Sequence, residues 1–235
     1  VDIKHLLSES RALPQSYFKG LNFLLNEQPD KAIEAFIEVV KADDPETIDL
    51  HFALGSLFRR RGEYDRAIRM HQNLVERVDL AEERKLAALF ELGQDYLKAG
   101  ILDRAEEVFK RLNNGPTARQ ALIFLLEIYQ AEKDWAKAIT TARELHVQSD
   151  FSYGAEIAHF HCELAQQNVL LGHPESARDH LARALETNRT CVRANVMLGD
   201  IDASAGNYPA ALSAWRAIEL QSPEGIELEI GRAHV

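Results

Sequence analysis

The stretch LGSLFRRRGEYDRAI, residues 54–68, sets a pattern that returns along the whole chain. Its leucine–glycine pair is followed by an aromatic residue at Phe58, a glycine at Gly62 and an alanine at Ala67. Versions of this pattern align on six alanines separated by 35, 38, 33, 39 and 34 residues, namely Ala32, Ala67, Ala105, Ala138, Ala177 and Ala211. The chain is therefore a tandem array of units of about 34 residues.

A period near 34 residues with this pattern is typical of the tetratricopeptide repeat, a helix–turn–helix unit that stacks on its neighbours. In the first unit, apolar residues recur at the spacing of one helical face, and Pro29 stands where a first helical turn tolerates proline. We therefore predict an all-α fold, a right-handed superhelical solenoid of about six helix–turn–helix repeats.

The repeats divide the chain into segments. They are expected to begin near Leu13, Ile48, Leu86, Arg119, Ala158 and Val192. Residues 81–84 are expected to form an extended join and residues 148–154 a turn-rich one. We assign residues 1–12 to a linker or lead-in helix and 13–229 to the repeat domain. Residues 230–235 (IGRAHV) resemble the translation of a common sequencing-adapter oligonucleotide and are expected to be a non-native tail.

Small and large residues alternate at fixed places in the repeats. Small residues in the first helix should let the second helix approach to about 8–10 Å. These are Gly20, Gly55, Gly93 and Gly199, with Leu126 in their place in repeat four. Large residues in the second helix, namely Phe36, Phe109, Leu181 and Trp215, are expected to seal the joint to the next repeat.

Composition narrows the class of function. The net charge is −10 and the sequence pI about 5.4, which disfavours a nucleic-acid binder because such domains are usually basic. Cys162 and Cys191 belong to no Cys-x-x-Cys pair, and their 29-residue separation is weak evidence for a disulfide, so we expect a reducing compartment. The chain has no apolar stretch of about 18 residues that could span a membrane.

Candidate catalytic and metal-binding groups are sparse. His159 and His161 are two residues apart and should point in nearly opposite directions on a helix, which excludes the paired metal-ligand arrangement. The sequence has no Ser-His-Asp pattern, phosphate-binding loop or dinucleotide fingerprint. We therefore expect no enzyme active site, no metal site and no cofactor in this chain, and a role in binding.

The first helix of each hairpin lines the concave face of such a solenoid, so it should carry the partner-binding residues. Aromatic anchors beside charged side chains are the residue types that dominate binding hot spots. The candidates are Tyr17, Phe52, Arg59, Arg60, Phe90, Gln94, Lys98 and Glu127. Further positions expected to be exposed are Leu21, Leu24, Asp49, Ser56, Leu97, Gln120, Ile123 and Gln130.

The run from Phe58 to Arg61, followed by Arg66 and Arg69, forms a positive island on an acidic chain. One interpretation is a dock for an acidic peptide or carboxylate, which arginine binds well. The other is a solvated turn whose arginines pair with Glu63 and Asp65. The sequence leaves both open.

Several longer stretches resemble the lipopolysaccharide assembly protein B family beyond what generic repeats share. They are SYFKGLNFLLNEQPDKA (16–32), LGSLFRRRGE (54–63), DRAIRMHQ (65–72), DRAE (103–106) and EIAHFHCELA (156–165). The resemblance runs from about residue 8 to residue 225. It implies a Gram-negative, single-pass inner-membrane protein that faces the cytoplasm.

The resemblance also implies segments that this chain does not contain, namely an N-terminal membrane helix and a C-terminal rubredoxin-like domain with an iron or zinc site. We expect the chain to be a fragment that lies between them. The family's role is that of an adaptor that helps the membrane protease FtsH degrade the deacetylase of the lipid A pathway. Its implied partners are FtsH, that deacetylase and lipopolysaccharide assembly proteins, and a homodimer is compatible with the sequence.

These observations support one hypothesis and two alternatives. The hypothesis is a regulatory adaptor of lipopolysaccharide biosynthesis that binds partners through its repeat groove. The first alternative is a general repeat scaffold for an envelope-assembly or secretion complex. The second, less favoured, is an enzyme whose catalytic domain lies outside this chain.

Overall fold

The computed structural model describes residues 15–26, 28–40, 47–148 and 151–219, and within them every regular element is an α-helix. The first six helices are α2 (Gln15–Leu25), α3 (Pro29–Val40), α4 (Ile48–Arg60), α5 (Tyr64–Glu76), α6 (Glu82–Lys98) and α7 (Leu102–Arg111). The next six are α8 (Ala118–Glu132), α9 (Trp135–Val147), α10 (Gly154–Leu170), α11 (Pro174–Thr187), α12 (Val192–Ser204) and α13 (Tyr208–Glu219). The predicted all-α fold of six helical hairpins is confirmed.

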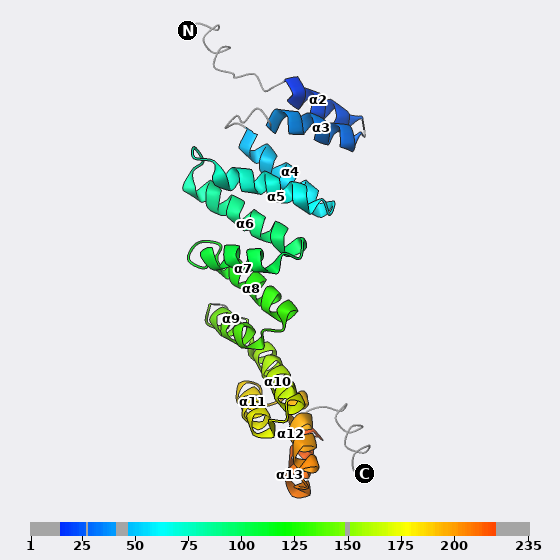
Figure 1. Ribbon diagram of the computed structural model, residues 1–235, viewed down its shortest axis with the longest axis vertical. Helices are drawn as coiled ribbons and strands as arrows, with labels where there is room; N and C mark the ends of the chain where they lie inside the picture. Colours follow the sequence, from blue (N-terminus) through cyan, green and yellow to red (C-terminus); the bar gives the residue numbers. More distant parts are fainter. Residues whose placement is uncertain (1–14, 27, 41–46, 149–150, 220–235) are drawn as a thin grey trace. The chain divides into compact units, whose positions relative to one another are not determined.

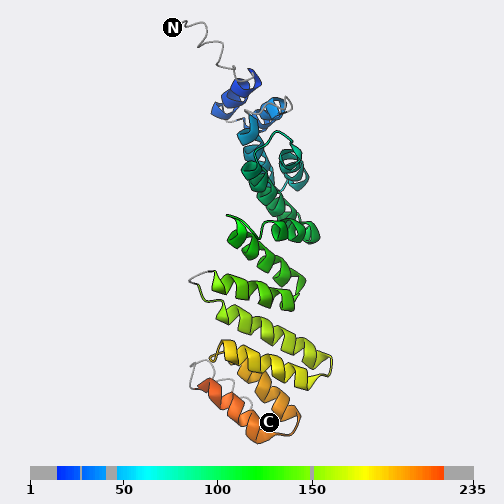
Figure 2. The same ribbon diagram turned by 90° about the vertical axis from the view of Figure 1, so that its left-hand side faces the viewer.

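The chain divides into two compact units, residues 1–112 and 113–235. In the first unit, α2–α3, α4–α5 and α6–α7 form hairpins, and α5 also packs against α6 (Figure 1). In the second unit, α8–α9, α10–α11 and α12–α13 do the same, and α9 packs against α10 (Figure 2). The expectations for residues 1–12 and 230–235 lie outside the described residues.

Each hairpin is held together where its two helices cross. All six repeat alanines are fully buried, at 0% exposure. A Cβ added to Gly20 would lie 2.6 Å from the ring of Phe36, and one added to Gly93 would lie 2.9 Å from the ring of Phe109. Large residues of the second helix therefore fill the space that glycine leaves in the first helix of the same hairpin.

The residue types at these two facing positions differ from repeat to repeat, but their sizes remain complementary. Repeat four reverses the sizes, with Leu126 on the first helix and Ala142 on the second, and both are buried. Repeat five pairs Ala165 with Leu181, and both are fully buried. Because a close-packed joint conserves total volume, a large residue on one helix accompanies a small one on the other.

Three details differ from the sequence-based expectations. The expected extended join at 81–84 is wrong, because α6 begins at Glu82 and the acidic side chains of Glu82 and Glu83 favour a helix N-terminus. Helix α10 begins at Gly154, four residues before the expected start. Leu97, expected on the exposed face, is 9% exposed and packs inward.

The turns between paired helices share one backbone conformation. Four of them carry a glycine with φ of 76° five residues before the repeat alanine, at Gly62, Gly100, Gly172 and Gly206. Repeat four has Lys133 at this position with φ of 58°. A side chain is therefore held in the left-handed region that L-residues disfavour.

Candidate partner-binding surface

The eight predicted contact residues lie on first helices, as expected from the repeat. Seven of them are in the first unit, on α2, α4 and α6, and Glu127 is on α8 of the second unit. Within the first unit, α4 and α6 contact each other directly. The surface that can be built from the structure is therefore the α4–α6 face, which we define by Phe52, Arg60, Phe90, Gln94 and Lys98.

The aromatic members of this set are half-buried rather than free. The ring centroids of Phe52 and His71 are 6.0 Å apart, and the guanidinium of Arg84 lies 5.4 Å from the ring centroid of Phe52. Phe90 meets Phe109 edge-on at 6.0 Å. Tyr17, on α2, similarly contacts Phe36. Each ring is anchored on one side and partly accessible on the other.

The polar members differ in accessibility. Arg60 ends α4 and Lys98 ends α6, and both are exposed, whereas Gln94 between them is half-buried. Glu127 is exposed on α8. Among the other expected positions, Leu21, Asp49, Gln120, Ile123 and Gln130 are exposed, Ser56 is half-buried, and the side chain of Leu24 lies outside the described residues.

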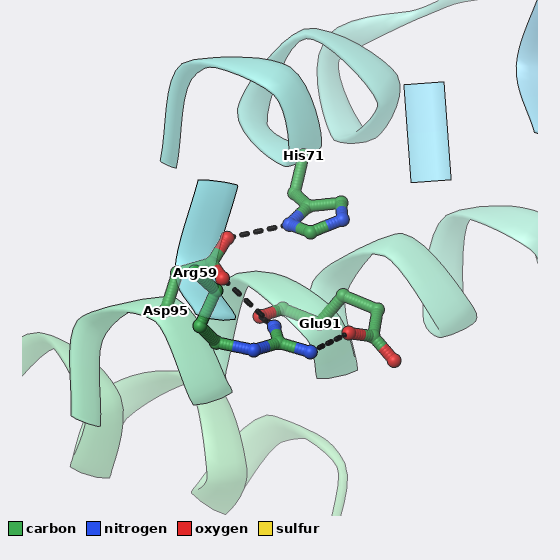
Figure 3. Close-up of polar contacts among 4 residues, drawn as sticks. All are labelled: Arg59, His71, Glu91 and Asp95. Carbon is green, nitrogen blue, oxygen red and sulfur yellow. Dashed lines mark hydrogen bonds and ion pairs between the residues drawn. The ribbon is translucent and has the colours of Figure 1, made fainter. Parts of the chain in front are cut away.

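Arg59 has internal partners (Figure 3). Its Nη1 atom donates to Oδ1 of Asp95 at 2.8 Å and to the backbone carbonyl of Glu91 at 3.1 Å. Its Nη2 atom lies 2.5 Å from Oε2 of Glu91. Burial lowers the pKa of Arg59, but the hydrogen bond and charge of Glu91 and the charge of Asp95 outweigh it and leave the pKa raised. The guanidinium thus joins α4 to α6.

Behind Arg59, the second oxygen of Asp95 contacts His71. Oδ2 of Asp95 lies 2.5 Å from Nδ1 of His71, and both side chains are 0% exposed (Figure 3). The other ring nitrogen of His71, Nε2, has no hydrogen-bond partner among the described residues and faces Gly55. The group connects three successive helices, α4, α5 and α6, and stands beneath the α4–α6 face.

Sequence reasoning did not single out His71 or Asp95, although the repeats contain a signal. His71 occupies the position of Phe36 and Phe109, four residues after the repeat alanine. Asp95 occupies the position of Leu57 and Ile128. The position of His71 is apolar in the other repeats, whereas that of Asp95 is also polar at Asn22 and Gln167. The usable signal is therefore the histidine at an apolar position, because a buried polar side chain needs a polar partner.

The positive island is largely neutralised within the chain. Phe58 is fully buried, with the guanidinium of Arg66 4.0 Å from its centroid. Arg61 pairs with Asp30 at 2.9 Å and with Glu63 at 3.0 Å, and Arg66 also pairs with Glu63. Arg60 and Arg69 are exposed and make no ion pair with the described residues. For most of the island the structure thus favours internal pairing, with Glu63 as predicted.

The second unit has a groove that sequence reasoning missed. It measures about 480 Å³ and lies between α10, α11 and α12, with Val169, Met197 and Ile201 among its lining residues. Arg178 on its wall pairs with the buried Asp202 at 2.7 Å. Glu175 and Asp200 also line the groove, so it combines apolar walls with a few charged groups, a mixture found in binding pockets.

The histidines behave as the helical spacing predicted. His159 is exposed and lies near Glu163, whereas His161 is 3% exposed. Nδ1 of His161 lies 3.3 Å from Nδ1 of His180. The described residues hold no group of three or more His, Cys, Asp or Glu side chains that could bind a metal ion.

Comparison with protein-family models matches a tetratricopeptide repeat model to residues 19–77, 52–118 and 164–224. These matches cover more than half of the chain. The chain belongs to the tetratricopeptide repeat family. The predicted repeat architecture is confirmed.

Curated relatives of this tetratricopeptide repeat protein share one name. Lipopolysaccharide assembly protein B of Escherichia coli (strain K12) is 39% identical over 217 residues, which is 92% of this chain and 56% of the relative. The protein of the same name from Haemophilus influenzae is 36% identical over 226 residues, with the same coverage. The resemblance inferred from sequence is confirmed, and the chain spans about half the length of the curated relatives it matches.

Among solved structures, a tetratricopeptide repeat protein from Parabacteroides merdae aligns with 88% of this chain and 80% of its own, at 15% identity and a TM-score of 0.48. Of the helices that the structure describes, none is both long and apolar enough to cross a membrane.

Proposed function

We propose that this chain is the partner-binding part of an adaptor that regulates lipopolysaccharide biosynthesis. The supporting observation is the α4–α6 face, where half-buried aromatic rings at Phe52 and Phe90 lie on adjacent helices that end in exposed Arg60 and Lys98. Anchored aromatic rings lose little entropy on binding, and nearby cations steer an acidic partner. The name shared by the relatives supplies the biological context.

In its specific form, the proposal is that the repeats hold the deacetylase of the lipid A pathway and present it to the FtsH protease. A scaffold of this kind needs no chemistry of its own, because bringing two proteins together raises their effective concentration. The full-length protein would add a membrane helix and a rubredoxin-like iron or zinc domain outside these repeats, and would act at the cytoplasmic side of the inner membrane. Homodimerisation and contact with other lipopolysaccharide assembly proteins are part of the same proposal.

The structure determines which variants test the binding face. Arg59 is unsuitable, because its replacement would disrupt the contacts with Glu91 and Asp95. Arg60→Glu combined with Lys98→Glu reverses two exposed charges at helix ends. Arg69→Glu is the matched control, because Arg69 is also exposed but lies on the second helix of its hairpin.

The experiment follows the half-life of the deacetylase in Gram-negative cells that carry the full-length protein with each variant. We expect the double reversal to lengthen the half-life and to reduce co-purification of the deacetylase and FtsH, and the Arg69→Glu variant to behave as wild type. An unchanged half-life with the double reversal would remove the α4–α6 face from the proposal.

The alternative is a general scaffold for an envelope-assembly or secretion complex. The groove of the second unit favours this alternative, because the groove offers a second, largely apolar binding site. Mass spectrometry of proteins captured by the full-length chain separates the two functions. Capture of other envelope proteins without the deacetylase or FtsH would support the scaffold.

A further inference from the structure

The two cysteines of the chain lie in contact although they are 29 residues apart. Cys162 is on α10, and Cys191 immediately precedes α12. Their sulfur atoms are 3.9 Å apart, and both thiols are free. Since the chain has no other cysteine, each thiol has only this one intramolecular partner.

The surroundings of the two thiols differ. Cys162 is fully buried in an apolar cluster with Ala158, Leu181 and Ala194. Cys191 lies at the edge of the same cluster and is partly exposed. A reagent in solution can therefore reach Cys191, whereas Cys162 can react readily only with what is already bound to Cys191.

The pKa values of the two thiols agree with this order, in which Cys191 reacts before Cys162. Hydrogen bonding from Cys162 and the backbone N–H groups of Ala194 and Arg193 lower the pKa of Cys191 to about 6. The hydrogen bond to Cys191 and burial raise the pKa of Cys162. A thiolate is the attacking species in thiol–disulfide exchange, so Cys191 attacks and Cys162 follows.

We propose that Cys162 and Cys191 form a redox-active dithiol that closes into an intramolecular disulfide, with a low-molecular-weight disulfide as the oxidant. The Cys191 thiolate attacks one sulfur of the oxidant, which releases one small thiolate and leaves a mixed disulfide on Cys191. Cys162 loses its proton to the solvent and attacks the Cys191 sulfur, which releases the second small thiolate. The two protein thiols are oxidised, and the oxidant is reduced to two thiols.

Closure requires the sulfur atoms to approach from 3.9 Å to about 2.05 Å. Cys191 precedes the first residue of α12, so its backbone is not held by a helical hydrogen-bond ladder on both sides. The bond would fix α10 to the start of α12. Both helices contribute residues to the groove, such as Val169 and Met197, so the redox state would control how freely that groove opens.

The test treats the folded 235-residue chain with oxidised glutathione and follows its intact mass. We expect the monomer to lose the mass of two hydrogen atoms, and peptide mapping to join the peptides of Cys162 and Cys191. Cys162→Ala should instead accumulate one glutathione on Cys191, because no second thiol displaces it. Cys191→Ser should react much more slowly.

Three results of the glutathione experiment would overturn the proposal. They are a stable glutathione adduct on the wild-type chain, disulfide-linked dimers as the main product, or two unreacted thiols under conditions that modify Cys162→Ala. Closure should also be faster in the folded chain than in urea. Faster closure in urea would show that the fold does not bring the thiols together, and this too would overturn the proposal.

Discussion

Nδ1 of His71 lies 2.5 Å from Oδ2 of Asp95, and neither side chain is exposed to solvent. Because Asp95 also accepts a hydrogen bond from Arg59, one carboxylate connects α4, α5 and α6. A buried carboxylate is tolerated only when its partners replace the lost water. This contact therefore fixes how repeats two and three meet, and with it the shape of the α4–α6 face.

The first prediction concerns the loss of this carboxylate. Asp95→Leu should lower the free energy of unfolding of the first unit by about 3–5 kcal/mol, because it leaves the buried His71 without its carboxylate partner and removes one of the two carboxylates that pair with Arg59. His71→Phe combined with Asp95→Leu should lose less, because it restores residue types found at these positions in sister repeats. Urea unfolding followed by circular dichroism measures both.

An exposed ion pair provides the control for this prediction. Asp49→Asn removes a carboxylate that also pairs across repeats, with Arg84, but is 82% exposed, so it should cost less than about 1 kcal/mol. Both tryptophans, Trp135 and Trp215, are in the second unit, so their fluorescence should be insensitive to these changes. A double variant no more stable than Asp95→Leu would show that His71 and Asp95 are not coupled.

The fold could be predicted from the sequence because the residue pattern that packs the two helices of a hairpin recurs six times. The alanines and most helix starts follow from steric limits that act within one hairpin. The start of α6 was missed because Glu82 and Glu83 look like loop residues unless their charge is read as favouring a helix N-terminus. Contacts between repeats, such as that of Arg59 with Asp95, depend on which side chains meet across a joint, and the period alone does not specify this.

A second prediction tests the size exchange between the helices of a hairpin. Gly93→Leu should destabilise the first unit by several kcal/mol, about the upper range for overpacking, because its side chain would collide with Phe109 and Val108. Phe109→Ala alone should cost about 3–5 kcal/mol through the cavity it leaves. Combining the two reproduces the Leu126–Ala142 pair of repeat four.

We expect the combined variant to be more stable than either single one by urea unfolding, since the added leucine fills the volume that Phe109 vacates. Additive losses would mean that the two positions do not share one space.

A third prediction concerns Lys133, which holds φ of 58° where four other turns have glycine. Lys133→Gly should stabilise the second unit by about 0.5–1 kcal/mol, because relief of the left-handed backbone outweighs the added freedom of the unfolded chain. Glu132→Gly, one residue earlier in the helix, should instead destabilise by about 1 kcal/mol. Tryptophan fluorescence during urea unfolding reports on both, and a loss of stability with Lys133→Gly would contradict the strain argument.

A fourth prediction uses the buried His161. Burial lowers its pKa to about 4, and the nearby His180, Arg143 and Arg183 add to the effect. The folded chain therefore keeps His161 neutral while the unfolded chain takes up a proton below about pH 6.5. Stability of the second unit should be complete above that pH and fall as the pH decreases towards 4, by an amount on the order of 1–2 kcal/mol at pH 5.

His161→Leu should flatten this pH dependence. Leucine occupies the equivalent position at Leu89 and Leu122, and His161 has a buried Nε2 atom without a hydrogen-bond partner among the described residues. Trp135 stacks on Phe160 beside this site, so its fluorescence reports the unfolding. His159→Gln, at an exposed histidine, should keep the wild-type slope, and an unchanged slope in His161→Leu would assign the acid sensitivity to other groups.

The candidate site was less predictable than the fold. Position within the repeat was enough to place Arg60, Lys98 and Glu127 on exposed surfaces. It could not reveal that Arg59 is occupied by Glu91 and Asp95, because the partner lies 32–36 residues away on another repeat. For the same reason, the 29-residue separation of Cys162 and Cys191 was weak evidence for a pair, although their sulfur atoms lie 3.9 Å apart.

The last prediction is the pH profile of Cys191. Its thiolate is stabilised by the Cys162 thiol and by the N-terminus of α12 with Arg193, which lowers its pKa to about 6, while Glu163 lies close to Cys162. Under reducing conditions, alkylation by iodoacetamide should therefore reach half of its plateau rate near pH 6 and change little above about pH 7.5, because the thiolate is then fully formed. Cys162→Ala should move the midpoint upward, towards the value of an ordinary thiol, because it removes the hydrogen-bond donor that contributes most to the shift. A rate in the wild-type chain that still climbs between pH 8 and 9 would show that Cys191 is an ordinary thiol, and that its contact with Cys162 does not activate it.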